Sequence, residues 1–339
     1  QERVLSSESS ALSGKWHNRN APYLVGPMEA ISDPGIEEVI IMSAAQVGKS
    51  ECLLNTIGRT IDREPSPILF LMPTTEMAQA MSKDRIQPMI RDTPCLRNKV
   101  ADPRSRDSGS TALHKVFSGG HLTLAGANSS ASLSARPIRY CLLDEVSRYP
   151  KAIADGSPIM LAKKRTVSFF NKKIVQTSTP TTKGDCVIEQ AYENSDKRRY
   201  YVPCPHCSHY QTLEWSQVIW DEGKPSTARI RCKECEKDWT EPQRIKSIQK
   251  GEWRSTQSNK TVAGFHIPGL LSTFVTPAQG AEEFLEVKDH PEQLRTWVNC
   301  YLGETFETAG DVLDHNSIME RRETYEHEVP KGGLLLTQS

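Results

Sequence analysis

The segment Val39-Ile40-Ile41-Met42-Ser43-Ala44-Ala45-Gln46-Val47-Gly48-Lys49-Ser50 predicts a buried strand, then a phosphate-binding loop, then a helix that begins at Lys49. Backbone N–H groups in such a loop and at a helix N-terminus point toward phosphate oxygens, where the helix dipole also favours negative charge. Gly48 lets the backbone approach a phosphate, Lys49 reaches the β- and γ-phosphates, and Ser50 offers a hydroxyl to Mg²⁺. Ser43 stands where the common pattern has its first glycine, so an ordinary loop is the alternative. We expect residues 43–50 to bind ATP.

A second signal is Tyr140-Cys-Leu-Leu-Asp144-Glu145, in which a largely apolar run ends in two carboxylates. This pattern is typical of a buried parallel strand, and ligands of open α/β sheets bind at the carboxyl ends of such strands. We expect Asp144 to hold Mg²⁺, directly or through water, and Glu145 to orient and deprotonate the attacking water. The alternative is that both carboxylates only end the strand and cap the next helix. The adjacent pair favours hydrolysis over binding alone, because a nucleotide switch needs no dedicated base there.

Three hydroxyl side chains end another apolar strand, Ile174–Gln176. Thr177, Ser178 and Thr179 follow one crossover after the acidic strand, where they are placed to contact the γ-phosphate and report its loss. An ordinary strand followed by a turn is the alternative interpretation.

The cysteines include two C-x₂-C pairs, Cys204 with Cys207 and Cys232 with Cys235, and 24 residues separate the pairs. Each pair predicts a tight knuckle that turns two thiolates toward one ion, so together they complete a tetrahedral Zn²⁺ site. Four thiolates close the coordination shell, which favours a structural ion, and we place His206 and His209 outside that shell. Disulfide bonds are the alternative, but the other five cysteines show no pairing pattern.

The order of elements predicts an α/β fold with a mainly parallel sheet flanked by helices, because apolar strands alternate with helical patterns. The expected strands are 39–42, 68–72, 121–125, 140–144 and 173–177, and the expected helices lie near 49–61, 75–91, 151–165, 185–194, 277–289 and 291–302. The expected domains are an N-terminal arm (1–20), a P-loop ATPase domain (21–198), a zinc-ribbon module (199–256) and a helical or linker region (257–339).

The charge balance carries no signal for nucleic acid, because 42 Lys and Arg residues match 42 Asp and Glu residues. A DNA-binding protein needs only a local basic face, and binding through such a face depends on salt. Three basic runs are candidates, with a solvated surface as the alternative for each: Lys163-Lys164-Arg165, Lys172-Lys173 and Lys197-Arg198-Arg199. No apolar stretch approaches 18 residues, so we expect no membrane span.

With these motifs in place, the chain resembles the large terminase subunit of lambda-type tailed bacteriophages, the motor that packages DNA. The similarity includes the phosphate loop, the acidic strand, the Thr177–Thr179 run, the cysteine pairs, Ala21-Pro-Tyr23-Leu24 and Asn299-Cys-Tyr-Leu-Gly303-Glu304. That family tolerates a residue other than glycine at the start of its phosphate loop. In the family, the position of Tyr23 stacks against adenine, and the Thr177–Thr179 run couples hydrolysis to DNA movement.

The resemblance implies an ATPase, with ATP, Mg²⁺ and Zn²⁺ as cofactors, that forms a homo-oligomeric ring in the cytoplasm of the infected bacterium. Its implied partners are double-stranded DNA, the small terminase subunit and the capsid portal. Such motors often complete the active site with an arginine from the next subunit. Arg136 and Arg139 precede the acidic strand, and we favour Arg136 because Arg139 belongs to the strand itself.

Family members also carry a nuclease domain after the zinc region. The apolar run Gly333-Leu-Leu-Leu-Thr-Gln-Ser339 resembles the approach to the first nuclease strand, and the metal-binding aspartate does not follow it. We therefore expect the nuclease domain to be absent and this chain not to cut DNA. Two other functions are alternatives: a helicase-like zinc-ribbon ATPase, and a DNA-binding scaffold that is gated by nucleotide without hydrolysing it.

Overall fold

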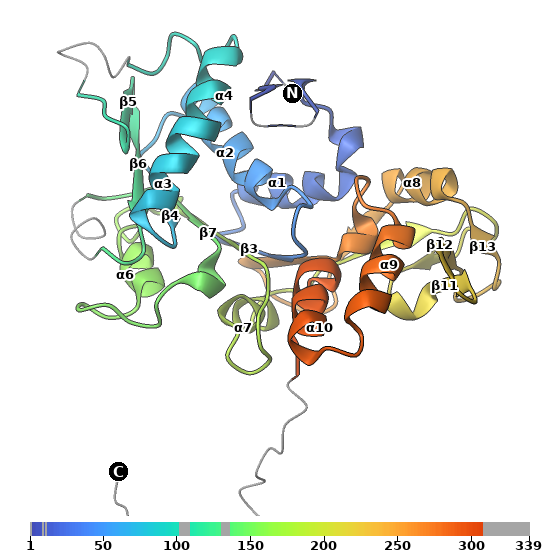
Figure 1. The fold of residues 1–339 in the computed structure, drawn as a ribbon. Helices are drawn as coiled ribbons and strands as arrows, with labels where there is room; N and C mark the ends of the chain where they lie inside the picture. Colours follow the sequence, from blue (N-terminus) through green and yellow to red (C-terminus); the bar gives the residue numbers. More distant parts are fainter. Residues whose placement is uncertain (1, 9, 11, 102–108, 130–135, 308–339) are drawn as a thin grey trace, which may run out of the picture. The chain divides into compact units, whose positions relative to one another are not determined.

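A seven-stranded sheet forms the centre of the computed structural model, which describes residues 2–8, 10, 12–101, 109–129 and 136–307 (Figure 1). The strand order is β15-β3-β8-β7-β4-β6-β5. All neighbours from β15 to β6 are parallel, and only the edge strand β5 is antiparallel. The strands are β3 (Glu38–Ser43), β4 (Ile68–Met72), β5 (His114–Phe117), β6 (Gly120–Gly126), β7 (Tyr140–Asp144), β8 (Lys173–Ser178) and β15 (Val262–Ile267). The expected mainly parallel sheet is confirmed.

Helices cover both faces of this sheet because its strands are apolar on both sides. Val39 and Ile41 of β3 join one buried cluster, which includes apolar residues of α1, α2, α3 and α4. Ile40 joins a second cluster on the other face, with residues of α6 and α7. These helices are α1 (Val25–Ser32), α2 (Lys49–Arg63), α3 (Thr75–Met81), α4 (Gln87–Asp92), α6 (Pro158–Lys164) and α7 (Val187–Glu193).

The expected helices near 75–91 and 151–165 differ from the structure. The first is divided by a π-helical turn at Ser82–Ile86, between α3 and α4. The second is shortened to α6, because Gly156 adopts a left-handed backbone conformation and Pro158 then occupies the first turn, a position that suits the start of a helix.

Two strands of the sheet were not expected, and β15 corrects our description of residues 257–339 as a helical or linker region. β15 pairs in parallel with β3 along its full length, from Val262 opposite Glu38 to Ile267 opposite Ser43. A short apolar run does not by itself distinguish a strand from part of a helix. Its partner lies far earlier in the chain, so only the tertiary structure identifies it.

The residues around the cysteine pairs form two small sheets, with strand orders β10-β9-β14 and β11-β12-β13. Their elements are β9 (Arg199–Pro203), β10 (Tyr210–Gln211), β11 (Val218–Asp221), β12 (Lys224–Arg231), β13 (Asp238–Trp239), α8 (Glu241–Gln249) and β14 (Glu252–Arg254). Trp239 is buried in this core, whereas Trp215 contacts aromatic residues of the later helices α9 (Pro277–Val287) and α10 (Pro291–Trp297).

Residues Gln1–Phe306 cluster as one compact unit, so the divisions near residues 198 and 256 remain proposals based on sequence. The arm includes a short hairpin of β1 (Val4–Leu5) and β2 (Gly14–Lys15). Within the described ranges, no helix combines the length and the apolar character needed to cross a membrane.

Candidate nucleotide-binding site and metal centre

The phosphate loop connects β3 to α2, as the sequence predicts. Gly48 has a φ of 89°, in the left-handed region, and directly precedes the first helical residue, Lys49. A Cβ atom at Gly48 would also lie 3.1 Å from Leu24 Cδ1. Gln46 has a φ of 56°, so the loop contains a second left-handed residue that is not glycine. Such backbone conformations are costly and cluster at functional sites.

Side chains at the ends of two neighbouring strands, β7 and β8, converge on the loop that follows β3. Lys49 Nζ lies 3.0 Å from Glu145 Oε1 and donates to Thr179 Oγ1 at 2.7 Å. Ser50 Oγ donates to Asp144 Oδ2 at 3.0 Å. These contacts form because β3, β8 and β7 are adjacent and parallel, so their carboxyl ends meet at one edge of the sheet.

Asp144 and Thr177 occupy matching positions on β7 and β8, and the Thr177 hydroxyl donates to Asp144 Oδ1 at 2.6 Å. Burial raises the pKa of Asp144 above its ordinary value, and the hydrogen bond from Thr177 opposes that shift. The Ser50 hydroxyl and the Asp144 carboxylate are both oxygen donors, the ligand type that Mg²⁺ prefers. The pair therefore fits an Mg²⁺ ion.

Glu145 is held by backbone geometry that is uncommon for a side chain of its size. Its φ of 57° and ψ of 46° place it in the left-handed region, directly after β7. Its Oε2 atom is buried without a hydrogen-bond partner and lies 3.7 Å from Arg148 Nε. This oxygen makes no hydrogen bond in the structure, so it retains the capacity to accept one from a water molecule, as a general base requires.

A cavity of about 570 Å³ lies over the phosphate loop, which is within the usual size range of ligand pockets. Lys49, Ser50, Glu145 and Thr179 line it on one side. The cavity is also lined by residues that the sequence analysis did not assign to the nucleotide site: Leu5, Leu12, Trp16, Arg85, Arg148, Phe274, Val275 and Cys300.

Tyr23 corrects our expectation of a ring that stacks on adenine. Its side chain is fully buried and does not line the cavity, so it offers no face to a base. The hydroxyl donates to the Val47 carbonyl at 3.1 Å, and the Tyr23 carbonyl accepts from Trp253 Nε1 at 3.0 Å. Tyr23 therefore supports the phosphate loop from within the core.

We expect Tyr23→Phe to lower the free energy of unfolding by about 1 kcal/mol, because it leaves the buried Val47 carbonyl without this donor. Urea denaturation followed by fluorescence measures the change. Tyr201→Phe, in β9, is the control. A Tyr23→Phe protein as stable as the unsubstituted chain would show that the hydroxyl does not support the loop.

The two candidate arginines lie apart from the cavity. Arg136 is exposed, and its guanidinium lies 3.1 Å from His114 Nε2 on the edge strand β5. Arg139 forms an ion pair with Glu64, hydrogen bonds to Ser66 and lies over the Tyr140 ring, so its contacts are structural. Among the described residues, two arginines line the cavity: Arg85, which forms an ion pair with Glu51, and Arg148, three residues after Glu145.

Most of the candidate basic residues for DNA contact are already paired. Lys163 and Lys172 form ion pairs with Glu38 and Glu37, and Lys173 is buried. Lys197 and Arg198 form ion pairs with Glu193 and Asp196. Because these side chains already have partners within the chain, the contacts do not favour DNA binding by the basic runs.

The four paired cysteines meet, as their spacing predicts. Their sulfur atoms all lie within 4.8 Å of one another, with Cys204–Cys235 and Cys207–Cys232 separations of 3.8 Å. Tetrahedral thiolates at the usual Zn–S distance of about 2.3 Å lie about 3.8 Å apart, whereas disulfide sulfurs lie about 2.05 Å apart. The cluster therefore fits Zn²⁺, and all four cysteines are free thiols here.

Backbone N–H groups near the knuckles donate to the sulfurs of Cys204 and Cys232, which favours the thiolate form that binds a metal. The backbone N–H groups of His206 and Glu234 donate to Cys204 and Cys232, each at 3.4 Å. Ser208 and Glu236, each one residue after a knuckle, have left-handed φ values of 62° and 56°. Burial opposes ionisation of Cys232, but the backbone N–H groups of Cys235 and Glu234 lower its pKa to about 6.

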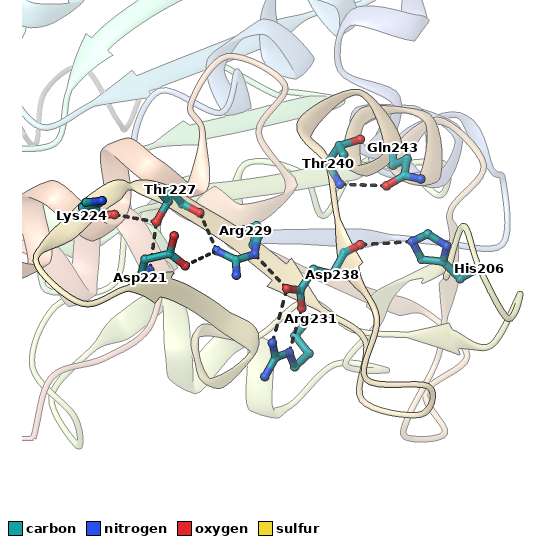
Figure 2. Close-up of polar contacts among 9 residues, drawn as sticks. All are labelled: His206, Asp221, Lys224, Thr227, Arg229, Arg231, Asp238, Thr240 and Gln243. Carbon is teal, nitrogen blue, oxygen red and sulfur yellow. Dashed lines mark hydrogen bonds and ion pairs between the residues drawn. The ribbon is translucent and has the colours of Figure 1, made fainter.

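His206 lies outside the cluster, as expected. Its Nε2 atom is 3.1 Å from the Asp238 carbonyl, on β13 (Figure 2). Figure 2 also shows Arg229 and Arg231 converging on the Asp238 carboxylate, with Nε distances of 2.8 Å each. Because these groups are largely exposed, the pairs orient β12 against β13 and contribute little to stability.

The fold and the two sites together define a P-loop ATPase that carries a Cys₄ module. Comparison with known proteins identifies the family: residues 10–253 match the family described as phage terminase large subunit gpA, ATPase domain. The chain belongs to this family, as the motifs in the sequence indicate.

Curated relatives agree with this assignment. The terminase large subunit of Enterobacteria phage P21 is 29% identical, and that of Escherichia phage lambda is 27% identical. Each alignment covers 98% of this chain and 56% of the relative, so the chain spans about half the length of the curated relatives it matches. Among solved structures, the large terminase ATPase domain of Thermus phage P74-26 has a TM-score of 0.48 at 13% identity, covering 84% of this chain and 96% of that one.

The comparisons overturn our expectation that the nuclease domain is absent. Residues 262–339 match the family described as terminase large subunit gpA, endonuclease domain. We had looked for that domain after the apolar run 333–339, which lies outside the described residues, whereas the match begins at β15. Therefore, the absence of nuclease activity does not follow from the sequence.

Proposed function

We propose that this chain hydrolyses ATP to drive double-stranded DNA into a phage capsid. The observation that carries the proposal is the convergence of Lys49, Ser50 and Glu145 at one cavity, with the buried Asp144 accepting a hydrogen bond from Ser50 directly behind it. A structural loop would not need a buried lysine that faces two separate strand ends.

Each residue has a distinct role in the proposed reaction. Residues 43–50 bind the phosphates, Ser50 and Asp144 hold Mg²⁺, and Lys49 neutralises phosphate charge. Glu145 accepts the proton of the attacking water. The hydroxyl of Thr179, which contacts Lys49 here, and those of Thr177 and Ser178 report the loss of the γ-phosphate to the rest of the chain.

The assembled state is also part of the proposal. Its partners are double-stranded DNA, the small terminase subunit and the capsid portal, in a homo-oligomeric ring within the host cytoplasm. Arg136 supplies charge to the site of the next subunit, since it is exposed and lies apart from its own cavity. The Cys₄ module holds Zn²⁺ as a structural ion.

Steady-state hydrolysis across protein concentrations, with and without double-stranded DNA, tests this function. We expect turnover that rises with concentration and falls by at least about 100-fold in Lys49→Ala, because phosphate binding and charge stabilisation are lost together. Lys151→Ala, at an exposed ion pair, is the matched control.

Mixing variants tests the arginine in trans. Arg136→Ala and Lys49→Ala proteins, each inactive alone, should recover activity when combined, because mixed rings contain sites with an intact loop and a neighbouring arginine. No recovery, together with a loss in Arg148→Ala, would assign the cation to the same chain.

The two alternatives make different predictions. ATP binding without turnover under every condition would favour the nucleotide-gated scaffold. A helicase-like ATPase needs a second motor domain, and across the described ranges the chain forms one large parallel sheet.

A further inference from the structure

Residues 299–306, which we call the clamp segment, are not among the residues proposed to bind phosphate or Mg²⁺ or to accept a proton. They begin within a π-helical turn, Val298–Leu302, and end at Phe306, which bridges to Thr182. π-helical turns are rare and frequent at functional sites. The clamp segment lies within the stretch that matches the endonuclease family, yet it folds into the same compact unit as the ATPase sheet.

One side of the clamp segment contacts the phosphate loop through backbone atoms. The Cys300 carbonyl accepts from the Ala45 N–H at 2.7 Å. Gly303 approaches so closely that a Cβ atom there would lie 2.6 Å from the Ala44 nitrogen. Its φ of 66° adds a second reason for glycine. Movement of the loop therefore moves the clamp segment.

A buried histidine holds the clamp segment from the other side. His266 Nδ1 accepts from Arg199 at 2.7 Å, so its Nε2–H donates to the Gly303 carbonyl at 2.9 Å. Burial, followed by the nearby Arg199, lowers the pKa of His266 to about 3, and the ring is neutral at neutral pH. Through His266, the clamp segment is tied to β15 and β9.

The Asn299 side chain connects the clamp segment to the loop that follows β8. Its Nδ2 donates to the Thr181 carbonyl at 2.8 Å and to the Glu304 carbonyl at 2.7 Å. The Phe306 N–H also donates to Thr181, at 3.0 Å. Thr181 lies two residues after Thr179, whose hydroxyl contacts Lys49.

We propose that Asn299 is a positioning residue for ATP hydrolysis, and that the clamp segment transmits the nucleotide state of the site into the endonuclease-matched stretch. The inference rests on the proposed binding of ATP at the phosphate loop. Asn299 is mostly buried, and its two N–H groups fix the distance between two carbonyls. If the Thr181 carbonyl moves with Thr179, the Glu304 carbonyl must move with it, because breaking either buried hydrogen bond to Asn299 is costly.

The test compares Asn299→Ala with the unsubstituted chain by two measurements. We expect kcat to fall about tenfold while KM for ATP changes by less than about threefold, since Asn299 acts on geometry and not on binding. Hydrogen exchange is measured with and without Mg·ATPγS. In the unsubstituted chain, nucleotide should slow exchange at the amides of Ala45, Lys183 and Phe306. In Asn299→Ala, nucleotide should still protect Ala45 but should no longer protect Lys183 and Phe306.

Two further variants separate positioning from a merely structural role. Asn299→Gln retains the two N–H donors, so it should recover part of the turnover. Asn299→Asp replaces these donors with oxygens that cannot donate to the two carbonyls, so its turnover should be as low as that of Asn299→Ala. Asn194→Ala removes an exposed side-chain bond to the Gln190 carbonyl and is the control.

Unchanged turnover per folded molecule in Asn299→Ala, or nucleotide-dependent protection that persists at Phe306, would overturn the inference. If the unsubstituted chain binds ATPγS but does not hydrolyse ATP, the proposed function fails. Hydrogen exchange still tests whether the clamp segment transmits the nucleotide state. Loss of nucleotide-dependent protection at Phe306 in Asn299→Ala would support that transmission, and retained protection would reject it.

Discussion

Glu145→Gln should lower kcat for ATP hydrolysis by about 10²- to 10⁴-fold, because it removes the group that accepts the proton of the attacking water. The substitution retains the size of the side chain, so the left-handed backbone after β7 is not disturbed further. ATP affinity should stay within about threefold, since affinity for the phosphates comes from the loop and Lys49. Steady-state turnover and binding of a fluorescent ATP analogue measure the two effects separately.

A matched control distinguishes this effect from the loss of a charge in general. Glu222→Gln changes an exposed glutamate in the turn between β11 and β12, and it should hydrolyse ATP at the normal rate. Glu145→Gln also weakens the ion pair with Lys49, so thermal unfolding is measured alongside. Turnover that survives in a folded Glu145→Gln protein would contradict the assignment of the base.

Removal of the metal should produce the largest loss of stability in this chain. Structural Zn²⁺ contributes about 10–16 kcal/mol of apparent binding free energy in small zinc domains at neutral pH. We expect one zinc ion per chain by elemental analysis, and a strong chelator should expose Trp239, which is buried in the module. Tryptophan fluorescence and the midpoint of thermal unfolding report the change.

Cys232→Ser tests the same site without a chelator. Cys232 is buried and accepts from Gln211 Nε2 at 3.3 Å, so its loss removes a ligand from an otherwise closed shell. Cys95→Ser, outside the cluster, is the control and should bind zinc normally. A chain purified without chelator that contains no zinc, or a Cys232→Ser chain with unchanged zinc content, would contradict the Cys₄ site.

The strands that hold the site could be predicted because their signals are local. Each of these strands is an apolar run followed by polar residues that can bind phosphate or Mg²⁺ or act as a base, such as Asp144 and Glu145. The rule that parallel strands present their carboxyl ends at one edge then brings Lys49 and Asp144 together without further information. The structure places Lys49 at the cavity and Asp144 just behind its wall, where Asp144 accepts a hydrogen bond from Ser50.

Two other expectations were wrong: the stacking role that the resemblance implied for Tyr23, and the description of residues 257–339, which include strand 262–267, as helical or linker. Tyr23 lies in a short motif, but its side chain is buried in the core and its carbonyl accepts from Trp253, which is distant in sequence. Val262–Ile267 has a strand-like composition, but its place beside β3 is set by that partner. Neither the Tyr23–Trp253 contact nor the pairing of β15 with β3 can be recognised from a periodic pattern in the sequence.

Residue types and short spacings thus suffice for the phosphate loop, the acidic strand and the two cysteine knuckles, because each is formed by neighbours along the chain. The hydrogen bonds of Asn299, the cavity position of Arg148 and the buried state of Tyr23 depend on which distant segments pack together. The free energy of that packing is summed over the whole core, so it cannot be assigned to any one stretch of sequence.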